Sequence, residues 1–174
     1  SPQHPDGDPS LTCVVEDPIK VDPEINGVTY KYYNQSTGRP MSVGCGLAEA
    51  LIELGDVLAE YNITEVLHIG TFNCRKISGT NRLSEHASAN AIDIWGFVDA
   101  NGERYILEEH WEHDTTTFST DKARILYEIG QKMHQRQIFH TILTPNYNAG
   151  HDNHFHVDLK PGANFIGLSE YPEY

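Results

Sequence analysis

The residues of this sequence with the clearest chemical potential are histidines and aspartates that fall close together. Residues 151–158 read HDNHFHVD and so hold three histidines and two aspartates. Successive side chains of a β-strand alternate between its two faces, so His154, His156 and Asp158 would share one face. Phe155 would then point to the opposite, apolar side. Two imidazoles that project together in this way could bind a metal ion or move a proton.

A second segment adds the same two residue types. His86 is followed by Asp93, which lies inside the apolar run 91–94. A carboxylate is costly to bury in such a strand without a partner, and a metal ion would remove that cost. Two neutral imidazoles and one carboxylate suit Zn²⁺ and leave a fourth position for water, whose pKa zinc lowers from roughly 15.7 to about 7. Non-haem iron uses similar ligands, but its common His-x-Asp pair is spaced more closely than His86 and Asp93.

A lone histidine on a strand is more often a core or surface residue than a metal ligand. Metal binding is favoured here because a His followed by an Asp is combined with a later His-x-His strand. Both segments also adjoin loops that contain Gly and Asn, where a cleft could form. For the other histidines that follow the N-terminal segment we expect ordinary surface or helix-face positions: His68, His110, His113, His134 and His140.

The overall composition excludes some functions. Lys and Arg total 12 against 25 Asp and Glu, a formal net charge of −13 that opposes binding to nucleic-acid backbones and to anionic membranes. The apolar fraction of 39% is enough for a packed core, and no apolar run approaches the about 18 residues of a membrane span. We therefore expect a single domain over residues 13–174, preceded by a flexible, proline-containing arm over residues 1–12.

Apolar periodicity predicts an α+β fold. Apolar residues recur at helical spacing over 47–61, which predicts an amphipathic helix. They do so again over 125–133, in a second helix that Thr120 or Asp121 could cap. The segments with strand-like composition are 26–34, 63–72, 91–97, 104–107, 138–143 and 153–159.

Three cysteines leave the disulfide state open. A bridge between Cys45 and Cys74 would join two consecutive elements and would contribute roughly 3–4 kcal/mol of stability. Two buried free thiols fit the sequence equally well. The odd count also permits one bridge and one leftover thiol, so the cysteines alone do not decide the compartment.

The first histidine segment resembles a known motif. Residues 84–93 resemble the Ser-x-His-x-x-Gly-x-Ala-x-Asp motif of the D-Ala-D-Ala carboxypeptidase and vancomycin-resistance dipeptidase group of zinc peptidases, with Ala89 in place of the Gly. Residues 154–156 are similar to the His-x-His of the superfamily named after lysostaphin, D-Ala-D-Ala carboxypeptidase and Sonic hedgehog. That superfamily includes penicillin-insensitive murein endopeptidases.

A narrower resemblance spans about residues 40–160. Segments 74–75, 83–87, 90–93 and 143–158 look like those of the bacterial extensin-like C-terminal family. The resemblance implies a hedgehog-like or D-Ala-D-Ala peptidase-like fold, in which a small antiparallel sheet carries a zinc site and two main helices flank it. Many members carry a further Cys in the helix before the last strand, which this chain lacks, so Cys13 is predicted to be unpaired.

The resemblance also implies roles for single residues. His86, Asp93 and His156 would be the zinc ligands, and His154 the catalytic histidine beside the metal-activated water. Arg75 resembles an arginine that stabilises developing oxyanion charge in the dipeptidases, although a surface salt bridge is an equal alternative.

The dipeptidases differ from this chain at the residue that acts as the catalytic base. Their catalytic Glu precedes the last ligand by three residues, and Asn153 occupies that place here. His154, or less favourably His151 or Asp152, would then have to accept the proton. Asp158 could orient a ligand imidazole or simply cap the end of the strand.

The function that the resemblance implies is a periplasmic or secreted zinc peptidase. Its partners would be the peptide stems of peptidoglycan, in which it would hydrolyse D-amino-acid bonds, with cross-link D,D-endopeptidase activity preferred. The alternatives are a D,D-carboxypeptidase or dipeptidase, and a non-catalytic zinc-containing cell-wall binding module, which the Asn at position 153 favours. A metal-dependent nuclease is opposed by the charge of −13. The sequence does not define an oligomeric state.

Overall fold

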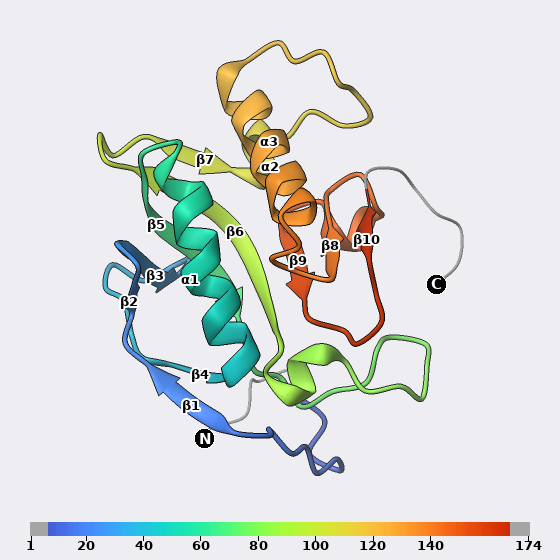
Figure 1. Cartoon of the computed structure of the whole chain (residues 1–174). Helices are drawn as coiled ribbons and strands as arrows, with labels where there is room; N and C mark the ends of the chain where they lie inside the picture. Colours follow the sequence, from blue (N-terminus) through green and yellow to red (C-terminus); the bar gives the residue numbers. More distant parts are fainter. Residues whose placement is uncertain (1–6, 168–174) are drawn as a thin grey trace.

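A mixed β-sheet forms the centre of the molecule, and two long helices cover one of its faces (Figure 1). The computed structural model describes residues 7–167. The sheet contains eight strands within that range. Seven follow the order β10-β8-β9-β6-β5-β3-β2, and β7 pairs with the C-terminal part of β6. A separate two-stranded sheet pairs β1 with β4.

The elements follow one another along the chain in an α+β order. The strands are β1 (Pro18–Val21), β2 (Glu24–Ile25), β3 (Val28–Tyr32), β4 (Met41–Gly44), β5 (Ile63–Gly70), β6 (Ala91–Asp99), β7 (Arg104–Ile106), β8 (Thr141–Leu143), β9 (Phe155–Asp158) and β10 (Phe165–Gly167). The α-helices are α1 (Cys45–Ala59), α2 (Leu107–His110) and α3 (Asp121–Gln135), and the 3-10 helices are η1 (Glu85–Ser88) and η2 (Ala149–His151).

The predicted α+β class is confirmed, but the sheet is larger than predicted and is not purely antiparallel. β3 pairs with β5 in parallel, as does β8 with β10. The parallel pairing of β3 and β5 follows from connectivity, because α1 lies between them in the chain and returns it to the same end of the sheet. The strand pattern in the sequence identified β3, β5 and β8 but not β10, and it carried no information on strand direction.

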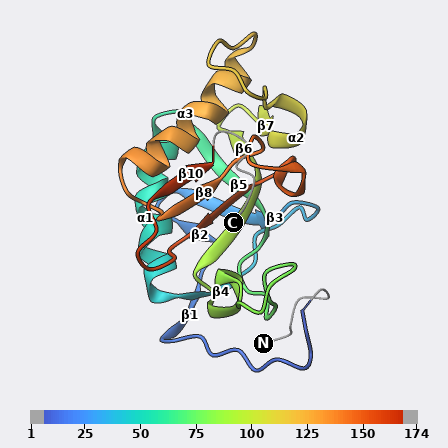
Figure 2. The same ribbon diagram turned by 90° about the vertical axis from the view of Figure 1, so that its right-hand side faces the viewer.

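The two main helices form where periodicity predicted them. In α1 the side chains of Leu47, Leu51, Leu54 and Leu58 are fully buried against the sheet. Thr120 caps α3, since its Oγ1 accepts a hydrogen bond from the amide of Ala123 at 3.1 Å. Figure 2 shows α1 and α3 on one side of the sheet, which leaves the other face without a long helix in the described part of the chain.

The chain contains one disulfide among the described residues, but Cys13, which was predicted to be unpaired, is one of its two partners. Cys13 and Cys74 form the bridge, with an S–S distance of 2.03 Å, and Cys45 is a free, exposed thiol at the start of α1. Residues 7–12 form no helix or strand, yet the amide of Asp8 donates to the carbonyl of Cys74 at 2.8 Å. The N-terminal segment therefore crosses the loop that follows β5, a contact that spans 61 residues of sequence.

Two other sequence predictions concern the ends of the chain and the membrane. The arm predicted over residues 1–12 lies partly outside the described residues, which begin at position 7. None of the helices between residues 7 and 167 has the length and apolar character that crossing a membrane would require.

Candidate metal centre

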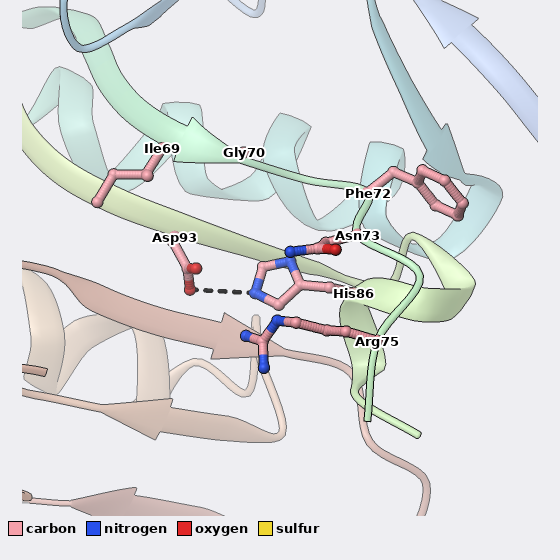
Figure 3. Close-up of a pocket in the computed structure, with 7 residues that line it drawn as sticks. All are labelled: Ile69, Gly70, Phe72, Asn73, Arg75, His86 and Asp93. Carbon is pink, nitrogen blue, oxygen red and sulfur yellow. Dashed lines mark ion pairs between the residues drawn. The ribbon is translucent and has the colours of Figure 1, made fainter. Parts of the chain in front are cut away.

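Side chains from three elements converge on one point beside the face of the sheet that has no long helix in the described part of the chain. His86 comes from η1, and Asp93 and His156 occupy directly paired positions of β6 and β9. Nε2 of His86 lies 3.2 Å from Oδ1 of Asp93, and Nδ1 of His156 lies 2.9 Å from the same oxygen. Figure 3 shows His86 and Asp93 pointing toward each other. The structure thus brings together all three of the ligands predicted from the sequence.

The spacing of these three atoms fits a tetrahedral ion. Bonds of about 2.0–2.1 Å at tetrahedral angles place neighbouring ligand atoms about 3.3–3.4 Å apart. The third separation, between Nε2 of His86 and Nδ1 of His156, is 3.3 Å, and the other two are only slightly shorter. His86, Asp93 and His156 are also the one group in residues 7–167 with metal-binding side-chain types and spacing.

The second nitrogen of each imidazole is held by an acceptor. Nδ1 of His86 lies 3.0 Å from the carbonyl of Thr71, and Nε2 of His156 lies 2.8 Å from Oδ2 of Asp158. A carbonyl or carboxylate oxygen can only accept, so each of these nitrogens carries a hydrogen, and in the neutral form of each ring the converging nitrogen holds the lone pair. Metal-ligating histidines show this arrangement. Of the two roles predicted for Asp158, the contact with His156 fits orientation of a ligand imidazole, and a second contact, from the amide of Lys160, fits a cap at the strand end.

The charges of these groups are strongly coupled. Burial raises the pKa of Asp93, but His86 and His156 outweigh burial and hold that pKa well below its ordinary value. Burial lowers the pKa of His156, whereas hydrogen bonds and charge from Asp158 and Asp93 raise it to about 9. Without a metal, His156 is thus a cation between two carboxylates, and a metal ion would replace its proton.

His154 lies at the edge of the cluster. Its Nε2 is 3.8 Å from Oδ1 of Asp93, and its Nδ1 is 2.8 Å from Oδ1 of Asn153. The amide oxygen of Asn153 can only accept, so Nδ1 carries the hydrogen and Nε2 faces the cluster with a free lone pair. Burial lowers the pKa of His154, with Asp93 opposing that shift, so the ring is neutral and able to accept a proton at neutral pH.

The two other candidates for the base differ in position. The ring of His151 lies 5.0 Å from that of His154 and 6.2 Å from that of His156. Burial, followed by the charges of those two histidines, lowers its pKa to about 4. Asp152 is 60% exposed and lies 3.6 Å from His113, outside the cluster. His154 is therefore the best placed of the three.

A cavity of about 330 Å³ opens beside the cluster (Figure 3). Arg75 lines it together with His86 and Asp93, and Figure 3 shows the guanidinium of Arg75 extending toward these two side chains. Its positive charge contributes to the lowered pKa values of His151 and His154. The alternative prediction, a surface salt bridge, finds no support, because Arg75 forms no ion pair with any described residue.

Some residues that shape the candidate metal centre gave no signal in the sequence. Thr71 holds His86 through its backbone carbonyl, which no residue type reveals. Gly70 lines the cavity at φ 151°, a backbone conformation that other residues rarely adopt, so this wall depends on glycine. Ser84 was part of the recognised motif, and its Oγ accepts a hydrogen bond from the amide of His86 at 3.3 Å.

One of the histidines expected at the surface is buried instead. His68 is only 8% exposed and pairs with Ile94 across β5 and β6, one pair away from Asp93. Burial lowers its pKa to about 4, although Asp93 acts in the opposite direction. The prediction was wrong because β5 is covered on both faces at this point, which the alternation of side chains does not reveal. His113 and His134 are exposed or half exposed, as expected.

One comparison with known proteins supports the extensin-like part of the sequence resemblance. Neither the curated proteins nor the solved structures contain a match to this chain. A family model does match, and it describes the C-terminus of extensin-like proteins over residues 1–166. That range includes the three converging side chains, His154, Arg75 and both cysteines of the disulfide. The chain is therefore a member of the extensin-like C-terminal family.

Proposed function

We propose that this protein is a zinc-dependent peptidase that hydrolyses D-amino-acid peptide bonds in peptidoglycan. The observation that carries the proposal is the convergence of Nε2 of His86, Oδ1 of Asp93 and Nδ1 of His156 at tetrahedral spacing. The opposite nitrogen of each imidazole is held by an acceptor, as in histidines that bind metals. Three protein ligands and an adjoining cavity are typical of a catalytic zinc site.

The protein side chains around the site have complementary roles. Bound Zn²⁺ would supply Lewis-acid chemistry and lower the pKa of water to about 7. His154 accepts a proton from the attacking water at Nε2. Asn153 fixes the tautomer that makes this nitrogen available. Arg75 lines the cavity as a permanent cation and stabilises negative charge that develops on the substrate oxygen.

The substrate class rests on the resemblance of residues 84–93 and 154–156 to the motifs of zinc D,D-peptidases. Cleavage of a cross-link is preferred, with a D,D-carboxypeptidase or dipeptidase as the alternative within the same chemistry. The Cys13–Cys74 disulfide supports a periplasmic or secreted location, because disulfides persist in oxidising compartments.

A non-catalytic zinc-containing cell-wall binding module is the second candidate. The observation that favours it is Asn153, which stands where the related dipeptidases have their glutamate base. The hydrogen bond from His154 to Asn153 weighs against it, because the amide there orients a neutral histidine toward the ligands. The two functions share the metal and differ in turnover.

The first experiment measures metal by plasma mass spectrometry on protein purified without chelator or histidine tag. We expect about one zinc per chain, lost in His156→Ala and kept in His113→Ala, whose histidine is half exposed outside the cluster. The second experiment incubates the zinc protein with cross-linked muropeptides and follows the products by chromatography. Cleavage that needs zinc and His154 supports the peptidase.

The outcomes separate the candidates. Bound zinc with no cleavage of any muropeptide would favour the binding module. A protein that neither holds zinc nor takes it up would contradict both. Release of terminal D-Ala without cleavage of cross-links would assign the carboxypeptidase instead.

A further inference from the structure

A second cavity lies next to the cavity of the metal centre. Its volume is about 590 Å³, within the range of about 300–1,000 Å³ that is usual for ligand sites. Phe72 is among the lining residues of both cavities, so the two cavities adjoin at this residue. Figure 3 shows the ring of Phe72 turned away from His86 and Asp93. A chain that passes Phe72 on its way out of the metal centre would enter the second cavity.

The lining of the second cavity differs from that of the first. The metal cavity holds Arg75, His86 and Asp93, whereas no described residue around the second cavity has an ionisable side chain, since both of its cysteines are in the disulfide. In a chain with a net charge of −13, such a neutral surface favours uncharged ligands over charged ones. It would accept an uncharged segment and would leave an ionised group without a partner. The hydroxyls of Thr12 and Ser42 can bond to peptide groups.

The N-terminal segment builds one side of this cavity. Residues 11–15 contribute Leu11, Thr12, Cys13 and Val15 to the lining, although they form no helix or strand. Two cross-connections to Cys74 hold the segment in place, namely the disulfide and the hydrogen bond from Asp8 to the Cys74 carbonyl at 2.8 Å. The cavity therefore depends on a contact that would be lost if the disulfide were absent.

We propose that the second cavity is a substrate subsite that binds an uncharged peptide segment extending from the scissile bond past Phe72. This inference rests on the proposed peptidase function, for which it defines a substrate longer than the bond that is cut. Substrates that fill the subsite gain binding, and short substrates that end at the metal centre do not. The disulfide acts here as a structural wall of the subsite.

Substitutions at two neighbouring positions test the subsite. Thr12 is exposed and lines the cavity, so Thr12→Trp would fill it without disturbing the core. Val14 is 74% exposed and does not line it, so Val14→Trp is the matched control. We expect Thr12→Trp to raise KM about tenfold for a cross-linked muropeptide and to leave a short stem-peptide substrate unaffected. Val14→Trp should change neither.

A binding measurement separates this inference from the peptidase proposal. Calorimetric titration with the uncharged peptide acetyl-(D-Ala)4-amide needs no turnover. We expect binding to the wild type, about tenfold weaker binding to Thr12→Trp and to Cys13→Ser, and unchanged binding to Val14→Trp and to Cys45→Ser, which removes the free thiol.

Each result has a defined meaning. Absent hydrolysis of every substrate, together with peptide binding that Thr12→Trp weakens, would refute the peptidase and retain the second cavity as a peptide-binding site. No binding of the neutral peptide, or equal binding to Thr12→Trp and Val14→Trp, would overturn the subsite even if zinc-dependent hydrolysis is found. Equal or tighter binding of a peptide with D-Glu in place of D-Ala would also overturn it.

Discussion

The two faces of the β6–β9 ladder serve different purposes. On one face, Ile92 pairs with Val157 and both are fully buried in the core beneath the helices. On the other face, the next pair along the ladder is Asp93 and His156, two of the candidate ligands. One backbone ladder therefore sets both the core packing and the distance between the ligands. A buried apolar face can thus fix the geometry of a polar site on its reverse side.

The apolar face of this ladder, which we call the packed face, is closely packed around Phe155. Its ring lies 5.6 Å from that of Trp111 and 6.5 Å from that of Phe97, with Gly130 of α3 close above it. Phe155 follows His154 and precedes His156, so this packing anchors the strand between two site histidines. If the two faces have separate roles, substitutions on one should change metal affinity and substitutions on the other should change stability.

The largest expected effect is on the polar face. Asp93→Asn removes the negative charge of the candidate ligand set, so we expect zinc affinity to fall on the order of 1,000-fold, beyond the 10–100-fold that outer contacts cost. Peptidase activity should fall in parallel. The measurement is competition with a fluorescent zinc chelator, with circular dichroism to verify the fold. A variant that kept its zinc would remove Asp93 from the site.

The packed face should give the next largest effect. Phe155 is fully buried, so Phe155→Ala should lower the free energy of unfolding by about 3–5 kcal/mol, as measured by urea denaturation of the metal-free protein. Tyr33 is 40% exposed, and Tyr33→Ala is the control, with an expected loss below about 1 kcal/mol. Equal losses at the two positions would show that burial does not distinguish them.

Sequence reasoning succeeded where local pattern decides the outcome. Helical spacing identified α1 and α3, and alternation placed Phe155 and Val157 in the core with His156 and Asp158 on the other face. Asp93 and His156 were recognisable because ionisable side chains are rare in apolar strands, and His86 because it precedes Asp93 in the motif at residues 84–93.

Sequence patterns did not predict the features that depend on contacts between segments far apart in the chain. Cys13 pairs with Cys74 because an irregular segment crosses the β5 loop, and no periodicity describes such a path. The parallel pairing of β3 with β5 depends on the direction of the chain after α1. Thr71 contributes only a carbonyl, a group that every residue has. The second cavity was missed for the same reason, since residues from both sides of the disulfide build it.

A smaller effect is expected from Asp158, which contacts the site through His156 alone. Asp158→Asn removes the charge opposite Nε2 of His156, and we expect zinc affinity to fall about 10–100-fold while one zinc still binds at saturation. Asp152→Asn is the control, since Asp152 is mostly exposed and outside the cluster. An unchanged affinity in Asp158→Asn would assign Asp158 to the strand end, where its Oδ1 accepts from the amide of Lys160 at 2.9 Å.

The smallest expected effect concerns a positive charge on the packed face, which would arise if His68 were protonated in the folded protein. His68 is buried, and its Nδ1 has no hydrogen-bond partner among the described residues. Burial lowers its pKa from 6.5 to about 4, so the unfolded chain binds a proton below pH 6.5 that the folded chain does not. The stability that neutral His68 allows is complete above pH 6.5 and is lost progressively as the pH falls toward 4.

His68→Leu removes this titration, so its stability should fall less steeply with acid than that of the wild type. Between pH 7.5 and pH 5.5 we expect the wild type to lose about 1.4 kcal/mol more than the variant, in urea denaturation with excess chelator. The chelator matters because loss of metal in acid would otherwise add to the slope. Parallel curves for the two proteins would mean that a proton reaches His68 in the folded state. The packed face would then yield to charge beside Ile94, and the separation of the two faces would not extend to that part of β5.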